Sequence, residues 1–136
     1  MVEIRVEYQG ELRCRAQHGP SGNDLTTDAP VDNQGRGESF SPTDLVATAL
    51  GSCMLTVMGI VAARHEWDLT GAHATVVKGM VADPARRIGS LVVELHLPAA
   101  LEAGARTALE RTALTCPVHK SLSADCDIPV GFHWDV

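Results

Sequence analysis

The sequence predicts a single α+β domain, with antiparallel strands at its N-terminus and a long buried central helix. Three observations lead to this prediction. The chain has 136 residues, a length that suits one domain (1–136) able to bury a core without disulfides or a structural metal. Segments of alternating apolar and polar residues, typical of strands, occur toward both ends. Between them, residues 45–63 contain no charged residue, as expected of a helix without a solvent-facing side.

Charge and composition exclude several classes of partner. The chain carries 11 basic and 17 acidic residues, a net charge of −6, so it would not neutralise a nucleic-acid backbone or an anionic membrane surface. Aromatic residues make up only 4%, too few to form platforms for stacked bases. The apolar content of 45% is too high for an intrinsically disordered chain. We therefore expect a globular protein that binds neither nucleic acid nor a membrane.

The N-terminal region reads as three strands followed by a loop. Residues 2–8 alternate in polarity and a second strand is expected over 11–17, with Gly10 marking a hairpin between them. A short third strand at 24–29 precedes the loop 30–40, which contains the run Gly-Arg-Gly-Glu. Since this N-terminus does not resemble a signal peptide, we expect a cytoplasmic protein with free thiols.

The central helix has a well-marked start. Ser41 fits an N-cap, Pro42 the first helical position, and Asp44 the acidic residue of a capping box. The helix should continue to about His65. Nineteen uncharged residues are also the minimum for a membrane span, but the glycines, serine and threonines among them favour a helix buried within protein. One sheet covers only one side of a helix, so a partner subunit is expected on the other side.

The second half of the chain predicts a further strand pair, a second helix, a short helix and a last strand. Alternation indicates strands over 72–82 and 91–97, joined by a turn at 83–87. A helix is expected from 98 to about 114, and a short helix is expected to start at Pro117, directly after Cys116, and to end near Ser123. Residues 130–136 alternate as the last strand. No nucleotide-binding glycine motif and no serine-hydrolase elbow is present.

Two cysteines are candidates for chemistry. Cys116 precedes a proline and would cap the short helix, whose dipole is expected to lower the pKa of the thiol. Cys53 lies in the central helix, where a plain core cysteine is the alternative. Cys14 is expected in the core, and Cys126 lies between two aspartates that would raise its pKa. A zinc site with Cys116, His119 and Cys53 would need a second close pair of ligands, which the sequence lacks. We expect no metal and no cofactor.

Two segments resemble a known family. Residues 41–53, with Ser-Pro-Thr-Asp at the start and Gly-Ser-Cys53 at the end, and residues 116–120, Cys-Pro-Val-His-Lys, resemble the OsmC/Ohr family of thiol-dependent peroxidases. The order of elements agrees over nearly the whole chain. The resemblance implies an intertwined homodimer, whose long central helices pack between the sheets of both subunits, with active sites at the subunit interface.

The resemblance also implies a reaction. Cys53 would be the peroxidatic cysteine, whose thiolate attacks an organic hydroperoxide, releases an alcohol and becomes a sulfenic acid. Cys116 would be the resolving cysteine that converts this acid to a disulfide, and an external dithiol, for which a lipoyl group is one candidate, would reduce it. The apolar helix residues around Cys53 favour a hydrophobic peroxide over hydrogen peroxide. They are Ala49, Leu50 and Val57.

The family pairs the thiolate with an arginine that a glutamate holds. Three arginines precede the central helix and could supply it, in this order of preference: Arg36, Arg13 and Arg15. The family glutamate follows the helix-opening proline, where this chain has Thr43, so Glu38 or Asp44 would have to replace it. This departure keeps a second hypothesis open, an OsmC-like dimer that binds a small ligand or senses redox state with little peroxidase activity.

Overall fold

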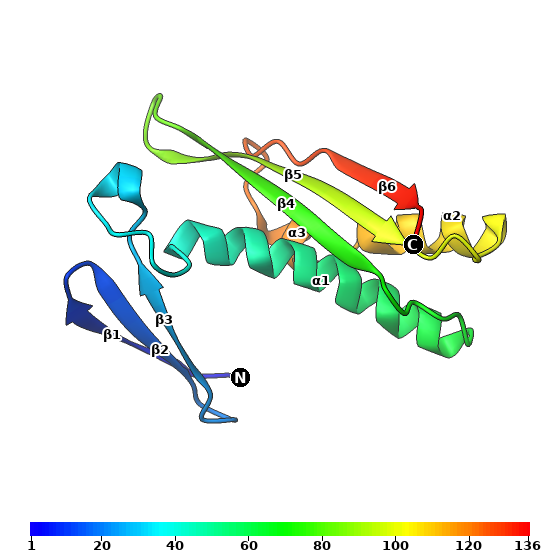
Figure 1. The fold of residues 1–136 in the computed structure, drawn as a ribbon, viewed down its shortest axis with the longest axis horizontal. Coiled ribbons are helices and arrows are strands. Elements are labelled where there is room, and N and C mark those ends of the chain that lie inside the picture. The colour runs from blue at the N-terminus through cyan, green and yellow to red at the C-terminus, as the bar shows by residue number, and fades with distance from the viewer. The chain divides into compact units, whose positions relative to one another are not determined.

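The strands of this protein form two separate three-stranded sheets, and one long helix follows the first of them (Figure 1). The computed structural model describes residues 1–136. The chain divides into two compact units, Met1–Val46 and Ala47–Val136, with one sheet in each. The predicted α+β class is confirmed. The expectations of a single domain and of a homodimer stay predictions.

The first unit is an antiparallel sheet of β1 (Ile4–Gly10), β2 (Arg13–His18) and β3 (Asp24–Asp28), in sequence order. The second strand was expected from residue 11, but Glu11 and Leu12 have φ angles of 54° and 63° and form the hairpin turn. Positive φ angles at two adjacent turn residues match the twist of a tight hairpin. Strand β2 therefore begins at Arg13, two residues later than expected.

The loop after β3 folds back onto the end of that strand. It contains a short 3-10 helix, η1 (Val31–Asn33). Gly35 lies so close to the backbone of Ala29 that a Cβ atom would stand 1.7 Å from the Ala29 carbonyl oxygen. Gly37 has a φ of 64°, and its N–H donates to the same oxygen at 3.2 Å. Two glycines thus allow the loop to return to β3.

The helix α1 (Pro42–Arg64) starts with the predicted capping box. The backbone N–H of Ser41 donates to the Asp44 carboxylate at 2.8 Å, and the Asp44 N–H donates to the Ser41 hydroxyl at 3.1 Å. The two contacts satisfy N–H groups that a helix start would otherwise leave without partners.

The second unit is a sheet backed by helices. Its strands are β4 (His73–Val81), antiparallel to β5 (Arg87–Leu97), and β6 (Val130–Trp134), parallel to β5. Two further helices, α2 (Ala103–Ala113) and α3 (Pro117–Ser121), lie between β5 and β6 in the sequence. In Figure 1 this sheet forms one layer and the helices form the other.

The core of the second unit lies between these two layers. Every second side chain of β5 from Leu91 to Leu97 has no exposed surface, and so do Leu50, Met54 and Met58 of α1 and Leu109 of α2. Each such side chain stabilises the fold by about 1.5–3 kcal/mol relative to exposure. At Gly51, α1 approaches β4 so closely that a Cβ would stand 2.9 Å from Val76 Cγ2.

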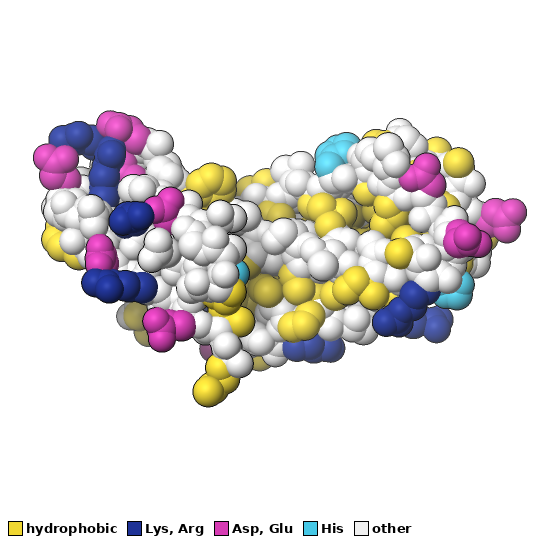
Figure 2. Space-filling view, turned by 90° about the horizontal axis from the view of Figure 1, so that it is seen from below, with side chains coloured by type: hydrophobic (Ala, Val, Ile, Leu, Met, Phe, Trp, Pro, Cys, Tyr) yellow, Lys and Arg dark blue, Asp and Glu magenta, His cyan; other side chains and the backbone are white.

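One face of α1 is exposed within a single chain, although the sequence predicted a helix without a solvent-facing side. Its members recur every fourth residue: Thr48, Ser52, Thr56 and Ile60. The hydroxyls of Ser52 and Thr56 donate to helix carbonyls at 2.8 and 2.7 Å. Figure 2 shows hydrophobic side chains exposed on the face that it draws. The helix is long and apolar enough to cross a membrane, with a mean hydropathy of 2.1, a property shared by core helices.

Candidate active site

Two cysteine side chains, distant in the sequence, meet in the second unit. Cys53 lies on α1 and is partly exposed, whereas Cys116 at the start of α3 is completely buried. The two thiols lie close enough that Cys53 contributes to raising the pKa of Cys116. The fold therefore brings together the two cysteines that the sequence selected.

Cys116 is the N-cap of α3, as the Cys-Pro sequence predicted. Its sulfur accepts a hydrogen bond from the backbone N–H of His119, with an N···Sγ distance of 3.2 Å. The expected direction of its pKa shift was wrong, because the pKa is raised. Burial is the main cause, and the Cys53 thiol adds to it, while the His119 and Val118 N–H groups act in the opposite direction. A five-residue helix does not offset the loss of water around the sulfur.

The other two cysteines lie elsewhere and are also free thiols. Cys14 is on β2 and is partly exposed. The pKa of Cys126 is raised, first by burial and then by Asp127, against the opposing effect of Arg87. The sequence had predicted the direction from the flanking aspartates alone.

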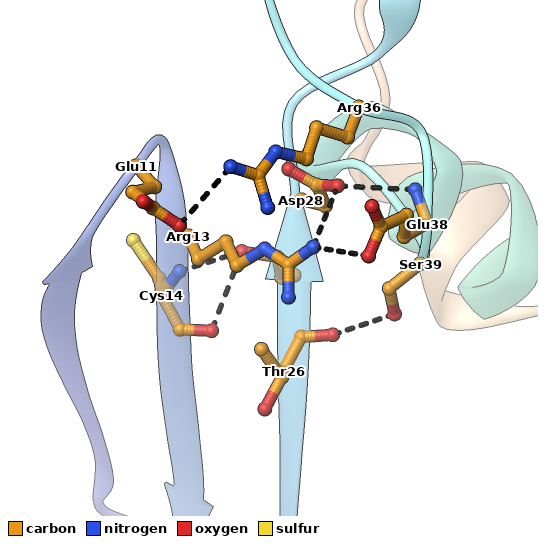
Figure 3. Close-up of polar contacts among 9 residues, drawn as sticks. Glu11, Arg13, Cys14, Thr26, Asp28, Arg36, Glu38 and Ser39 are labelled. Carbon is orange, nitrogen blue, oxygen red and sulfur yellow. Dashed lines mark hydrogen bonds and ion pairs between the residues drawn. The ribbon is translucent and has the colours of Figure 1, made fainter.

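A cluster of charged side chains forms the candidate arginine site in the first unit (Figure 3). Arg13 Nη2 lies 2.6 Å from Glu38 Oε2 and 3.5 Å from Asp28 Oδ2. Arg13 and Asp28 face each other across the β2–β3 ladder. The hydrogen bond with Glu38 raises the pKa of Arg13, with further contributions from the charges of Asp28 and Glu38. The guanidinium is thus held between two carboxylates.

The loop glycines shape this cluster. Because they return the chain to β3, the backbone N–H of Glu38 donates to Asp28 Oδ2 at 3.0 Å. This hydrogen bond is the main cause of the lowered pKa of Asp28, and Arg13 contributes. The carboxylate of Asp28 is therefore ionised although its side chain is only 1% exposed. A second hydrogen bond joins this loop to β3, because the Ser39 hydroxyl donates to the Thr26 carbonyl oxygen at 2.7 Å.

The other two candidate arginines have different partners. Arg36 is 59% exposed and lies 3.5 Å from Glu11 Oε2 (Figure 3). Arg15 pairs with Asp24, and both side chains are at least 42% exposed. The structure therefore brings Glu38 to Arg13, not to Arg36. Asp44 holds the start of α1 through Ser41.

Sequence reasoning missed Asp28. A signal for it existed, because alternation along 24–29 places Asp24, Thr26 and Asp28 on the strand face opposite the apolar one. The hairpin register then sets Asp28 opposite Arg13. In addition, no group of three or more His, Cys, Asp or Glu side chains is arranged to hold a metal ion.

Three comparisons describe what the chain is similar to. Residues 35–130 match the model of the family described as OsmC-like protein. A crystal structure from Psychrobacter arcticus, of a protein provisionally assigned to osmotic stress induction and the detoxification response, is 48% identical with a TM-score of 0.91. The match covers 98% of this chain and 96% of that one. No curated protein matches the sequence.

More distant solved structures share the fold. An organic hydroperoxide resistance protein OsmC from Legionella pneumophila has a TM-score of 0.79 at 17% identity, covering 98% of this chain and 96% of that chain. The organic hydroperoxide resistance protein OhrB of Bacillus subtilis has a TM-score of 0.66 at 15% identity, with 97% of each chain covered. At these identities the likeness concerns the fold alone.

Proposed function

Because the chain belongs to the OsmC-like protein family, we propose that it is a thiol-dependent peroxidase that reduces organic hydroperoxides to alcohols. The observation that carries the proposal is the proximity of the Cys53 and Cys116 thiols, since Cys53 contributes to raising the pKa of Cys116. Two sulfurs 63 positions apart in the sequence meet in one unit, where a sulfenic acid on one could be captured by the other. Two solved structures of the same fold are named for organic hydroperoxide resistance.

In the first step, the Cys53 thiolate attacks the terminal oxygen of the hydroperoxide. A sulfur–oxygen bond forms while the oxygen–oxygen bond breaks, so the sulfur is oxidised and the peroxide is reduced. Cys53 becomes a sulfenic acid, and the departing alkoxide takes up a proton to become the alcohol. Cys53 suits this role better than Cys116 because it is partly exposed, whereas Cys116 has no exposed surface.

In the second step, Cys116 resolves the sulfenic acid. Its sulfur displaces the hydroxyl from Cys53, a disulfide forms, and the thiol proton leaves with the hydroxyl as water. Burial and the neighbouring sulfur raise the pKa of Cys116, so this thiol keeps its proton until the sulfenic acid arises beside it. An external dithiol then reduces the disulfide through a mixed disulfide and becomes a disulfide itself.

For the arginine that the family resemblance implies as the partner of the thiolate, we propose Arg13 rather than Arg36. A thiolate in an apolar site needs a nearby positive charge, and a cation is useful only if its direction is fixed. Arg13 is 29% exposed and is held by Glu38 and Asp28, whereas Arg36 is 59% exposed with one distant carboxylate. In this proposal Glu38 takes part of the role of the family glutamate, whose position holds Thr43.

The remaining properties follow the same proposal. The partly exposed apolar residues Ala49 and Val57 near Cys53 suit a hydrophobic peroxide, whereas Leu50, the third residue expected there, is buried in the core. The protein acts as a cytoplasmic homodimer without a metal or cofactor, and the exposed face of α1 is the surface that a second copy would cover.

The test is peroxide consumption with dithiothreitol as the reductant. Wild-type protein and Cys14→Ser, a matched control at a cysteine outside the pair, should consume cumene hydroperoxide faster than hydrogen peroxide. Cys53→Ser should be inactive. Stoichiometric peroxide should link Cys53 to Cys116, as seen by peptide mass spectrometry. Full consumption by Cys53→Ser would refute the proposal, and a dimer without turnover would favour the ligand-binding or redox-sensing alternative.

A further inference from the structure

Three histidine side chains form a row across the second sheet. In the strand register, His96 of β5 stands opposite His73 of β4 and His133 of β6. Neighbouring ring centroids are 4.8 Å apart in both pairs, with interplanar angles of 7° for His73–His96 and 22° for His96–His133. Leu95 and Leu97, on either side of His96, are fully buried, so the row lies on the face of the sheet turned away from the core. The sheet therefore separates the row from the helices that carry the two thiols.

Two of these rings donate a hydrogen bond through the same nitrogen. His73 Nδ1 lies 3.0 Å from the Gly71 carbonyl oxygen, and His96 Nδ1 lies 3.0 Å from both carboxylate oxygens of Asp135. Carbonyl and carboxylate oxygens accept hydrogen bonds, so Nδ1 carries the proton in both rings. Each neutral ring consequently keeps a lone pair on Nε2.

The third ring uses its other nitrogen. His133 Nε2 lies 2.5 Å from Glu94 Oε2. Gly131 makes room for this contact, because a Cβ atom there would overlap the Glu94 carboxylate. The lone pair of His133 is therefore on Nδ1, beside the ring carbon that bears the side chain. His73 and His96 present one kind of nitrogen and His133 presents the other.

The partners of His73 and His96 lie at the same end of the sheet. Gly71 comes just before β4 and Asp135 just after β6. Because β4 runs antiparallel to β5 and β6 runs parallel to it, both partners lie where β5 ends. The two rings are fixed from the same end and are 7° from parallel. Their Nε2 atoms therefore occupy matching positions on neighbouring rings.

This pattern is the one that metal-binding histidines show. A histidine that ligates a metal through one nitrogen almost always donates the other N–H to a carboxylate or a backbone carbonyl, which fixes its tautomer and its ring orientation. His73 has the carbonyl and His96 has the carboxylate. Imidazole is also a ligand that suits divalent zinc.

We propose that His73 and His96 form a two-imidazole site for Zn²⁺ on the outer face of the second sheet, with Asp135 as the positioning residue for His96. No group of three or more His, Cys, Asp or Glu side chains is arranged to hold a metal ion, so water completes the coordination and the ion is exchangeable. Two nitrogens on one zinc lie at most about 4.2 Å apart, twice the zinc–nitrogen distance. Binding therefore requires the rings to tilt toward each other, which the exposed His73 at the start of β4 allows.

The site is independent of the proposed peroxidase reaction, which does not use this ion. His73→Gln should consume cumene hydroperoxide at the wild-type rate, and a failure of the proposed function would leave the zinc site untouched.

The experiment is a titration of the reduced full-length protein with Zn²⁺ at pH 7.5, followed by long-range ¹H–¹⁵N NMR of the imidazole rings. We expect Zn²⁺ to shift the Nε2 resonances of His73 and His96, while the Nδ1 resonance of His133 stays in place. This readout identifies the ligating atoms, so zinc bound by thiols elsewhere does not imitate it. Unchanged Nε2 resonances of His73 and His96 at an excess of Zn²⁺ would overturn the proposal.

Calorimetry on matched variants gives a second test. His73→Gln and His96→Gln should each abolish the binding event, whereas His133→Gln, in the same row, should keep it. If His96→Gln does not fold, the exposed His73 still provides the test. An equal loss in His133→Gln, or binding that survives in His73→Gln and disappears in Cys53→Ser, would show that the ion binds elsewhere.

The positioning role of Asp135 has its own control. Asp135→Asn should weaken zinc binding by about 10–100-fold, the range for a hydrogen-bond partner of a metal ligand. Glu94→Gln removes the same charge beside the ring that is not a ligand, and it should change the affinity far less. Equal effects of the two substitutions would mean that Asp135 acts only through its charge, and the positioning role would be wrong.

Discussion

The sulfur of Cys116 accepts the backbone N–H of His119 at 3.2 Å while it also contacts the thiol of Cys53. One buried atom therefore caps a helix and contacts the partly exposed cysteine. This double contact fixes the sulfur in place, because the cap leaves it little freedom to turn away. The proposed resolving role of Cys116 and the slow alkylation that we predict for it both depend on that position.

Replacing the resolving thiol should stop the cycle after one turnover. In Cys116→Ser, cumene hydroperoxide should still oxidise Cys53, but no intramolecular disulfide can form. Dimedone, which labels sulfenic acids, should trap Cys53 in this variant, with little labelling in the wild type. With excess peroxide, Cys53 should proceed to sulfinic acid. Steady turnover at the wild-type rate with dithiothreitol would show that Cys116 is not needed for resolution.

Cys116 should alkylate slowly in the folded protein. Its pKa is raised by burial and by Cys53, so the reactive thiolate is scarce near neutral pH and appears only above the range of an ordinary thiol. The rate at which iodoacetamide labels Cys116, measured between pH 7 and pH 10, should begin to rise at a higher pH in the folded protein than in urea. Equal labelling rates in the two states would contradict this expectation.

Acid should destabilise the protein partly through Asp28. The folded-state pKa of Asp28 is lowered, first by the Glu38 N–H and then by Arg13. The contribution to stability is therefore fully present above the unfolded pKa of about 3.9 and is lost as the pH falls through the folded pKa. Urea midpoints measured from pH 7 down to pH 3 should fall less steeply for Asp28→Asn than for the wild type. If the urea midpoints of the two proteins fall in parallel with pH, protonation of Asp28 does not contribute to the loss of stability in acid.

Gly51 should not tolerate a side chain. A Cβ there would stand 2.9 Å from Val76 Cγ2, so Gly51→Ala must push α1 from β4, at a cost of about 1–3 kcal/mol for overpacking. At Gly104 of α2, a Cβ would meet no atom within 4 Å, and Gly104→Ala should stabilise the protein by up to about 1 kcal/mol through helix propensity. The free energies of unfolding of the two variants, measured with urea and compared with that of the wild type, test both expectations. A Gly51→Ala variant as stable as the wild type would show that β4 can shift to accommodate the added methyl group.

The exposed face of α1 should be needed for assembly. Ile60 is 49% exposed in a single chain, and a charge buried there without a partner would oppose association. Ile60→Glu should shift the protein from dimer to monomer in size-exclusion chromatography with light scattering. A wild-type protein that is monomeric at the same concentration would refute the predicted homodimer.

Local chemistry explains which features could be predicted from the sequence. The capping box of Ser41 and Asp44 depends on residues within one helical turn, and the capping role of Cys116 depends on the proline after it. Both were found because their causes lie in neighbouring residues. The meeting of Cys53 and Cys116 was expected only through a resemblance, since no local rule joins positions this far apart.

The features that were missed depend on tertiary structure. Which arginine serves Cys53 stays a prediction, but the pairing of Glu38 with Arg13 was not expected, since it depends on the loop glycines that bring the chain back to β3. The pKa of Cys116 was expected to be lowered by a dipole, which a sequence shows, and it is raised by burial, which only a packed structure shows. The pairing of Asp28 with Arg13 depends on the register between β2 and β3, which alternation along a single strand does not give.

The hydroxyls along the exposed face of α1 have one more consequence. Ser52 and Thr56 donate their protons to carbonyls of their own helix, so neither requires an acceptor from whatever lies against that face. A surface of this kind can lose its water without leaving a donor unsatisfied. Recognition there must come from the fit of methyl and methylene groups, so a size change at Ser52 should matter more than a change in its polarity.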